Sequence, residues 1–288
     1  MSAQPFNQAI GVYYAQQKFS PEAKADVENK VTTMIAIFKQ RLEANQWLNE
    51  TTRQKAIIKL NTIVPHIGYP EKLPDRLYQK IVQPEMTLFE TATQFRQIEI
   101  AYTWSQWHQP VNRSEWHMPA HLVNAYYDPQ QNQIVFPAAI LQAPFYSLKQ
   151  SSSANYGGIG AVIAHEISHA FDTNGASFDE YGSLNNWWTD ADFAAFKLRT
   201  DKVVKQFDGL DSYGAKVNGK LTVSENVADL GGLAAALAAA KLDADFSAVA
   251  FFESWATIWR MKARPEYMRL LAASDPHAVS YTHLTLPT

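Results

Sequence analysis

Hydrophobic positions in the first part of the chain recur at the spacing of one helix face. Between Pro21 and about Ala44, the apolar stripe consists of Val27, Val31, Ile35 and Phe38. Residues three and four apart share a face of an α-helix, so this stripe predicts one long amphipathic helix. A second helix is predicted from about Glu50 to Thr62, and the segment 65–70, which has a proline at each end, is expected to break the helical pattern.

The rest of the chain predicts more helices and one short pair of strands. The further helices are expected at 84–102, at 155–172, and from a cap at Thr189 or Asp190 to about Phe207. Apolar and polar residues alternate around 122–127 and 133–136, which is typical of a two-stranded element. The pattern as a whole predicts a mainly α fold with a small β-sheet.

The segment His165-Glu166-Ile167-Ser168-His169 lies inside the predicted helix 155–172. Two histidines four residues apart share one helix face, so both imidazole rings can bind the same metal ion. Glu166 is rotated by roughly 100° from His165 and is expected beside the positions where water binds. The preceding run 157–164 is small and apolar, which predicts a buried, rigid helix. The H-E-x-x-H spacing is the arrangement found in zinc metallopeptidases.

A catalytic zinc site needs a third protein ligand, and the best candidate is in the segment 223–232. Ser224 is expected to cap a helix here, which puts Glu225 and Asp229 one turn apart on a common face. Glu225 can then bind the metal while Asp229 accepts the second N–H of a ligating histidine and fixes its tautomer. The alternative is two solvated carboxylates on an alanine-rich helix. Cysteine is not available as a ligand because the chain has none.

Composition limits the classes of partner. Hydrophobic residues make up 47% of the 288 residues and charged residues 18%, which is enough for a sizeable core. The net charge of -3 and the lack of a basic run give no reason to expect nucleic acid. No apolar run approaches the roughly twenty residues that cross a bilayer. The absence of cysteine excludes disulfides and favours a reducing compartment.

Four blocks of sequence are shared, in the same order, with one known family. They are Val123–Tyr127 with Asn132–Ala138, the histidine segment extended to Gly175, Gly219–Gly232, and Arg264–Tyr267 with Asp275–His277. In these blocks the chain resembles the neprilysin-like zinc endopeptidases, peptidase family M13, and among them the cysteine-free bacterial oligopeptidases of the PepO type. The similarity runs from about Ala9 to His277.

The resemblance implies a thermolysin-like (gluzincin) zinc metallopeptidase catalytic domain that acts on oligopeptides and binds one Zn²⁺ per chain. The implied zinc ligands are His165, His169 and Glu225. Glu166 would be the general base, Asp229 would orient His165, and His277 would donate a hydrogen bond to the oxyanion formed during attack. We also expect a monomer, located in the bacterial cytoplasm because the chain has no cysteine, with an exported or surface location as the alternative.

Six further residues match substrate-binding positions of the family. Asn124 and Ala125 would hold the substrate backbone as an added strand. The pocket just beyond the cleaved bond would be lined by Ile140, Phe145, Val162 and Trp259. Their apolar character predicts cleavage before large hydrophobic residues. Simple core packing is the alternative for these four, because apolar residues are usually buried.

Two other hypotheses remain open at this point. The chain can be another H-E-x-x-H peptidase with a distal glutamate ligand, such as an aminopeptidase, although the blocks around Asn124 and His277 argue against it. From a different class, it can be a truncated zinc-binding or peptide-binding remnant without activity. Zinc bound without cleavage of any peptide would favour this second hypothesis.

Both ends of the chain differ from the family pattern. Residues 1–278 are expected to be a catalytic domain whose N-terminal part is incomplete, with most of the helical cap region missing. The family has an arginine about six residues after the position of His277, where this chain has His283. The stretch 279–288 fits nothing in the family and resembles one reading frame of a transposon-end sequencing adapter. We therefore expect it to be a non-native tail.

Overall fold

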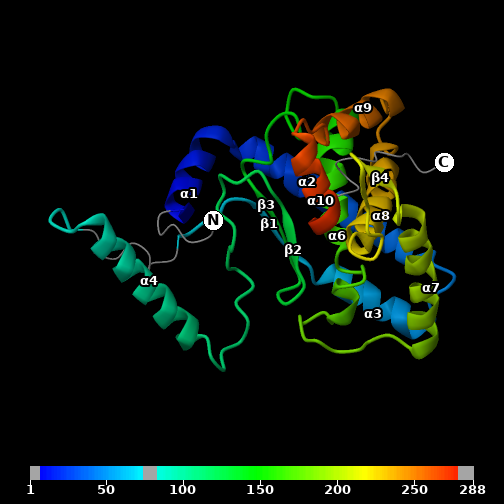
Figure 1. Ribbon diagram of the computed structural model, residues 1–288, viewed down its shortest axis with the longest axis horizontal. Helices are drawn as coiled ribbons and strands as arrows, with labels where there is room; N and C mark the ends of the chain where they lie inside the picture. Colours follow the sequence, from blue (N-terminus) through cyan, green and yellow to red (C-terminus); the bar gives the residue numbers. More distant parts are fainter. Residues whose placement is uncertain (1–6, 74–82, 278–288) are drawn as a thin grey trace.

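The computed structural model describes residues 7–73 and 83–277 (Figure 1). Within these residues the chain is mostly helical, with one three-stranded and one two-stranded sheet. The prediction of a mainly α fold with a small sheet is confirmed. The stretch 279–288 lies outside the described residues, so its expected non-native origin stays a prediction.

Three helices begin the described chain: α1 (Asn7–Lys18), α2 (Pro21–Glu43) and α3 (Glu50–Asn61). The two predicted helices are α2 and α3, and each ends one residue before the predicted boundary. Ser20 and Asn49 cap them, because their side chains accept backbone N–H groups of the first turn. The predicted stripe of α2 faces the core, where Val27 and Val31 are fully buried.

The larger sheet has three strands rather than the predicted two: β1 (Val64–Gly68), β2 (Tyr126–Asp128) and β3 (Gln133–Pro137). The order is β1-β3-β2, with β1 parallel and β2 antiparallel to β3. The expectation that 65–70 only breaks a helix was wrong. Its hydrogen-bonding partner is a strand far along the chain, and Pro65 is tolerated because β1 is an edge strand.

The histidine-bearing helix is built from three consecutive pieces: α5 (Ser152–Asn155), the π-helical turn η2 (Tyr156–Gly160) and α6 (Ala161–Ser168). Every residue of α6 is buried, as the apolar run predicted. The predicted continuation to Asp172 was wrong. The chain turns after Ser168, and the Asp172 carboxylate accepts the backbone N–H groups of Asn174 and Gly175, each at 2.7 Å. Gly175 begins the short 3-10 helix η3 (Gly175–Ser177).

The C-terminal part adds α7 (Asp190–Phe207), β4 (Asp211–Ser212), β5 (Ala215–Lys216), α8 (Val223–Ala240), α9 (Ala248–Ile258) and α10 (Pro265–Ser274). Thr189 caps α7, as predicted. The prediction that Ser224 caps α8 was wrong. The helix begins at Val223 with Thr222 in the cap position, and the Ser224 hydroxyl donates to Asp172 instead.

The core lies between α2, the three-stranded sheet, α6 and α8. The α8 helix approaches α6 so closely that a Cβ on Gly232 would lie 2.6 Å from the backbone nitrogen of His165. Helix α4 (Leu88–Ser105), predicted at 84–102, projects away from this body (Figure 1). None of the described helices is long and apolar enough to span a membrane.

Candidate active site

Two elements bring the predicted metal ligands together. His165 lies in α6 and His169 directly follows it, while Glu225 is in the first turn of α8. Their ligand atoms lie within 4.8 Å of one another. The two Nε2 atoms are 2.9 Å apart, and Glu225 Oε2 is 3.2 Å from His165 Nε2 and 3.3 Å from His169 Nε2. Residues far apart in sequence thus present three ligand atoms to one point.

The opposite nitrogen of each histidine ring is held by a carboxylate. His165 Nδ1 lies 2.8 Å from Asp229 Oδ1, the pairing predicted from the spacing in α8. His169 Nδ1 lies 2.6 Å from Asp172 Oδ2. Because a carboxylate accepts hydrogen bonds, each Nδ1 carries a proton, and in the neutral form of the ring the lone pair is at Nε2. Both rings are therefore fixed in orientation and in tautomer.

This arrangement fits a divalent cation. With both Nδ1 atoms protonated, each neutral ring has only a lone pair at Nε2, and the two lone pairs face each other beside a carboxylate oxygen. That oxygen, Glu225 Oε2, is buried and has no hydrogen-bond partner among the described residues. Two histidines and one glutamate are a ligand set of catalytic zinc, which keeps its fourth position for water or substrate.

Electrostatics in the cluster follow from burial and mutual contact. Burial favours the neutral form of His169, but its contacts with the carboxylates of Asp172 and Glu225 outweigh burial and raise its pKa to about 9. Burial raises the pKa of Glu225, but its contacts with His165 and His169 outweigh burial, so the pKa of Glu225 is lowered overall. The carboxylates thus make both imidazoles strongly basic, which strengthens them as metal ligands.

Glu166 is buried beside the ligands without being one of them, with a relative exposure of 7%. Burial raises the pKa of its carboxyl group, and the charge of Glu225 acts in the same direction, while the nearby histidines lower the pKa. A carboxyl group with a raised pKa next to a metal-bound water is suited to take up a proton and deliver it again.

His277 reaches the same cluster from the segment after α10. Its Nε2 lies 3.3 Å from Glu225 Oε2, and its Nδ1 lies 2.9 Å from Asp275 Oδ1. The ring remains partly exposed, at 42% of its side chain. A partly exposed histidine beside Glu225 can contact a molecule bound at the ligand cluster.

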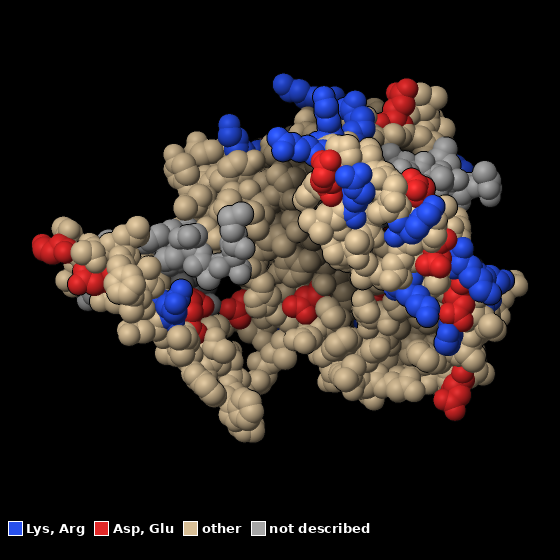
Figure 2. All heavy atoms as spheres, in the orientation of Figure 1, with Lys and Arg blue, Asp and Glu red and all other residues tan. Residues whose placement is uncertain are grey.

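The predicted substrate-binding residues lie around α6. Asn124 and Ala125 directly precede β2, an edge strand of the sheet that contacts α6. Ile140 and Val162 are buried in the core, whereas Phe145 packs partly exposed against it and Trp259 is half-buried after α9. Val162 is one turn before Glu166, so both are on one helix face. Figure 2 shows a hollow in the face between the sheet and α10.

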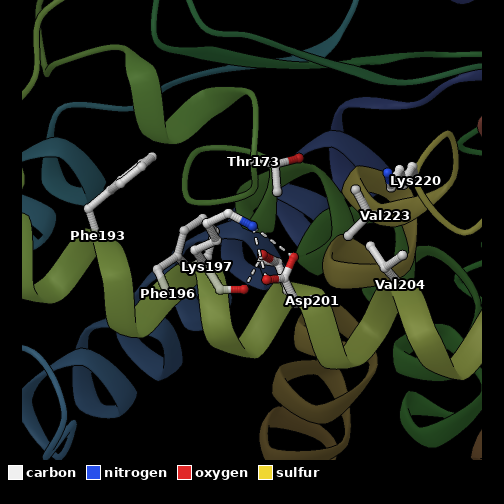
Figure 3. A pocket seen from close by; sticks show the side chains of 9 residues that line it. Thr173, Phe193, Phe196, Lys197, Asp201, Val204, Lys220 and Val223 are labelled. Atoms are coloured by element: carbon white, nitrogen blue, oxygen red, sulfur yellow. Dashed lines mark hydrogen bonds and ion pairs between the residues drawn. The ribbon is translucent and has the colours of Figure 1, made fainter.

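Figure 3 shows a separate pocket of about 250 Å³. It is lined mainly by α7, where Lys197 forms an ion pair with Asp201 at 2.9 Å. Thr173, Lys220 and Val223 also line it, and Thr173 and Val223 are close in sequence to residues of the cluster. None of the predicted site residues lines this pocket.

Comparison with known proteins agrees with the geometry. Models of peptidase family M13 match residues 124–285 and, for the N-terminal part of the family, residues 2–70. The chain belongs to peptidase family M13. The resemblance inferred from the four blocks is confirmed. The match reaches residue 285, and the origin of 279–288 stays a prediction.

Two bacterial proteins are among the relatives that the chain matches. A Streptococcus gordonii protein named "Putative zinc metalloproteinase in scaA 5'region" is 72% identical over 86% of this chain and 44% of its own length. A neutral endopeptidase of Lactococcus lactis is 51% identical over 98% of this chain and 45% of its own length. The chain therefore spans a little under half the length of these relatives.

Solved M13 structures share the fold. The crystal structure of PepO from Lactobacillus rhamnosis has a TM-score of 0.88 and 45% identity, over 96% of this chain and 44% of that protein. A zinc metalloprotease of Mycobacterium tuberculosis, solved in complex with an inhibitor, has a TM-score of 0.83 and 36% identity, over 95% and 44%. The fold class is thus that of M13 zinc metallopeptidases.

The M13 site contains two residues to which the sequence patterns assigned no role. Asp172 holds the ring of His169, and Asp275 holds the ring of His277. Asp172 lies three residues after His169, and this one-turn spacing was a usable signal. Asp275 lies two residues before its partner, in a non-helical turn, so no periodic pattern marks it.

Proposed function

We propose that this chain forms the catalytic part of a zinc endopeptidase that hydrolyses oligopeptides, and that it binds one Zn²⁺ through His165, His169 and Glu225. The observation that carries the proposal is the approach of both Nε2 atoms and Glu225 Oε2 to within 2.9–3.3 Å of one another. The names of the relatives support zinc as the metal.

When bound, zinc lowers the pKa of its water ligand and polarises the carbonyl group of the substrate. Glu166 takes the proton from the attacking water and then delivers it to the leaving nitrogen, which would otherwise depart as a poor anion. The buried position of Glu166 and the raised pKa of its carboxyl group support both steps.

His277 stabilises the negative charge that develops on the attacked carbonyl oxygen. Its Nδ1 is engaged with Asp275, so donation to that oxygen must come from Nε2. Asp229 keeps His165 in the orientation that ligation requires.

The substrate lies extended along the free edge of β2, with Asn124 and Ala125 contacting its backbone. Strand addition of this kind gives affinity through main-chain hydrogen bonds and selectivity through side-chain pockets. Ile140, Phe145, Val162 and Trp259 make the pocket beyond the cleaved bond apolar, so the enzyme prefers a large hydrophobic residue there.

A second candidate is a zinc-binding or peptide-binding part of such an enzyme that does not cleave by itself. The observation in its favour is length, because the chain spans only 44–45% of its relatives. Catalysis would then need residues that this chain does not contain.

Digestion of a mixed peptide library, followed by mass spectrometry of the products, separates these candidates. The endopeptidase proposal predicts internal cuts before large hydrophobic residues, loss of cutting with a chelator, and recovery when zinc is added back. Release of single N-terminal residues would indicate an aminopeptidase instead. Intact peptides together with bound zinc would support the inactive candidate and overturn the first.

A further inference from the structure

One lysine is buried next to the proposed metal site. Lys59, in the last turn of α3, has a relative exposure of 1%. Its Nζ atom lies about 6 Å or less from the ring centroids of Tyr127, Phe171 and Trp187. A buried ammonium group is costly unless it is fully hydrogen-bonded, so its partners indicate why it is there.

Lys59 donates to three backbone carbonyls of a single loop. The distances from Nζ are 2.8 Å to Ala170 O, 2.7 Å to Gly175 O and 2.7 Å to Phe178 O. An ammonium group has three protons, and all three are used. The loop that Lys59 binds begins directly after His169, so α3 fixes the chain at the exit of the histidine-bearing helix.

Asp172 lies inside the stretch that Lys59 holds. The Asp172 carboxylate receives His169 Nδ1–H at 2.6 Å on one oxygen and the N–H groups of Asn174 and Gly175 on the other. The carbonyl of Gly175 is bound by Lys59, so the same residue contacts both the lysine and Asp172. A continuous chain of contacts therefore joins Lys59 to the ring of His169.

The charges around Lys59 support this arrangement. Burial lowers the pKa of Lys59 to about 8, while the acidic groups of Asp172, Asp179 and Glu180 act in the opposite direction. The side chain therefore carries its charge at neutral pH. Asp172 belongs to the loop that the ammonium group binds, and Asp179 and Glu180 follow directly after it, so attraction to these groups adds to the three hydrogen bonds.

We propose that Lys59 is a positioning residue for the metal site, because it fixes the loop 170–178 so that Asp172 holds His169 in its metal-binding orientation. The proposal rests on the proposed function in taking His165, His169 and Glu225 as zinc ligands. It assigns a role at the site to a helix that contributes no ligand. It predicts that zinc affinity, and not only stability, depends on Lys59.

The test measures zinc affinity by competition with a chelating dye, together with the visible absorption spectrum of the Co²⁺-substituted chain. Lys59→Met keeps the apolar stem and removes all three donors. Loss of a residue that orients a ligand typically weakens metal binding about 10–100-fold, and we expect a loss in that range with a changed Co²⁺ spectrum.

Lys30→Met is the matched control. Lys30 is also a buried lysine, but it pairs with Asp26 inside α2, at 2.9 Å. Its removal destabilises the chain without touching the loop, so zinc affinity and the Co²⁺ spectrum should stay as in the wild type. A folded Lys59→Met chain whose affinity and spectrum match those of Lys30→Met would overturn the proposal.

Two further variants complete the test. Lys59→Met and Asp172→Asn should be non-additive in zinc affinity, because they act through one contact chain, and additive losses would contradict this. If Lys59→Met does not fold, Lys59→Arg replaces it, since a planar guanidinium cannot reproduce three converging bonds. Its zinc affinity must then fall below that of Lys30→Met, and equal affinities overturn the proposal. A wild-type chain that binds no zinc would overturn both this proposal and the proposed function.

Discussion

His277 differs from the other two histidines of the cluster in being partly exposed and in having its carboxylate partner only two residues away. Its position beside the ligand atoms, rather than among the three that define the candidate metal site, fits a group that touches the substrate. Its removal should therefore affect the reaction and leave the metal in place.

We expect His277→Ala to lower kcat about 100-fold or more, because one donor to the developing oxyanion is lost. Zinc content should stay at the wild-type level. Steady-state kinetics on a peptide substrate and elemental analysis of the same preparation check both parts. Loss of zinc in His277→Ala would mean that this histidine is a ligand, and an unchanged kcat would remove it from the reaction.

The main residues of the site could be predicted where they follow helical spacing. His165 and His169 are four apart, and Glu225 and Asp229 are four apart, so in each pair both members share a helix face. Asp172 had the right spacing but lies beyond the end of α6, in a turn. Lys59 had no signal at all, because a lysine in a helix is usually solvated and its burial depends on a loop more than a hundred residues away.

At the level of elements, the contact between α6 and α8 sets the distance between the histidines and Glu225. Gly232 allows this contact, since a Cβ there would lie 2.6 Å from His165 N and 2.8 Å from His165 Cα. Its neighbour Gly231 has more room, and the nearest atom to a Cβ there is Ser168 Oγ at 3.2 Å. The pair therefore offers a matched comparison.

Gly232→Ala should destabilise the chain by about 1–3 kcal/mol, because α8 must move away from α6. The same displacement moves Glu225 from the histidines, so zinc affinity should fall as well. Gly231→Ala should change both quantities little, since the Ser168 side chain can rotate. Thermal unfolding and zinc titration of both variants test this, and equal effects from the two substitutions would contradict the close contact.

Asp192 joins α7 to α3. Its buried carboxylate accepts hydrogen bonds from the Thr52 hydroxyl at 2.6 Å, from the Thr189 hydroxyl at 2.8 Å and from the Asn49 backbone at 3.0 Å. Burial opposes ionisation, but these donors outweigh it and lower the pKa of Asp192 below its usual value. A carboxyl group with a lowered pKa stabilises the fold above its unfolded-state pKa and loses that contribution as the pH falls through its folded-state pKa.

Asp192→Asn should therefore lower the free energy of unfolding at pH 7 by an amount on the order of 1 kcal/mol. The difference from the wild type should shrink below about pH 4, as Asp192 becomes protonated in the wild type. Chemical unfolding across this pH range measures it, with Asp190→Asn, an exposed neighbour in the same turn, as control. A difference that does not change with pH would show that the charge of Asp192 contributes nothing.

The helices were easier to predict than the strands. Local caps and spacing located α2, α3 and α7, because their signals lie within the elements themselves. By contrast, β1 depends on pairing with β3, from Val64 with Gln133 to Gly68 with Pro137, and no local pattern carries that information. The end of α6 was also missed, because side-chain bonds of Asp172 to the following backbone terminate it.

At the scale of the whole molecule, one hydrophobic core supports both the candidate metal site and the β2 edge where the substrate is proposed to bind. The sheet, α2, α6 and α8 share that core, so His165 on α6, Glu225 on α8 and the strand edge at β2 have fixed relative positions. The chain spans less than half of its relatives, and the composition of the sequence gave no sign of this. Only the resemblance to a longer family predicted it.

The proposed zinc endopeptidase mechanism is tested most directly by comparing the zinc-loaded wild-type chain with Glu166→Gln. The comparison measures turnover of one peptide blocked at both ends. The glutamine retains the shape of Glu166 and loses its ability to accept a proton. We predict one zinc per chain in both proteins, internal cleavage by the wild type, and no detectable cleavage by Glu166→Gln. Cleavage by Glu166→Gln at the wild-type rate, or a wild-type chain without zinc, would contradict the account.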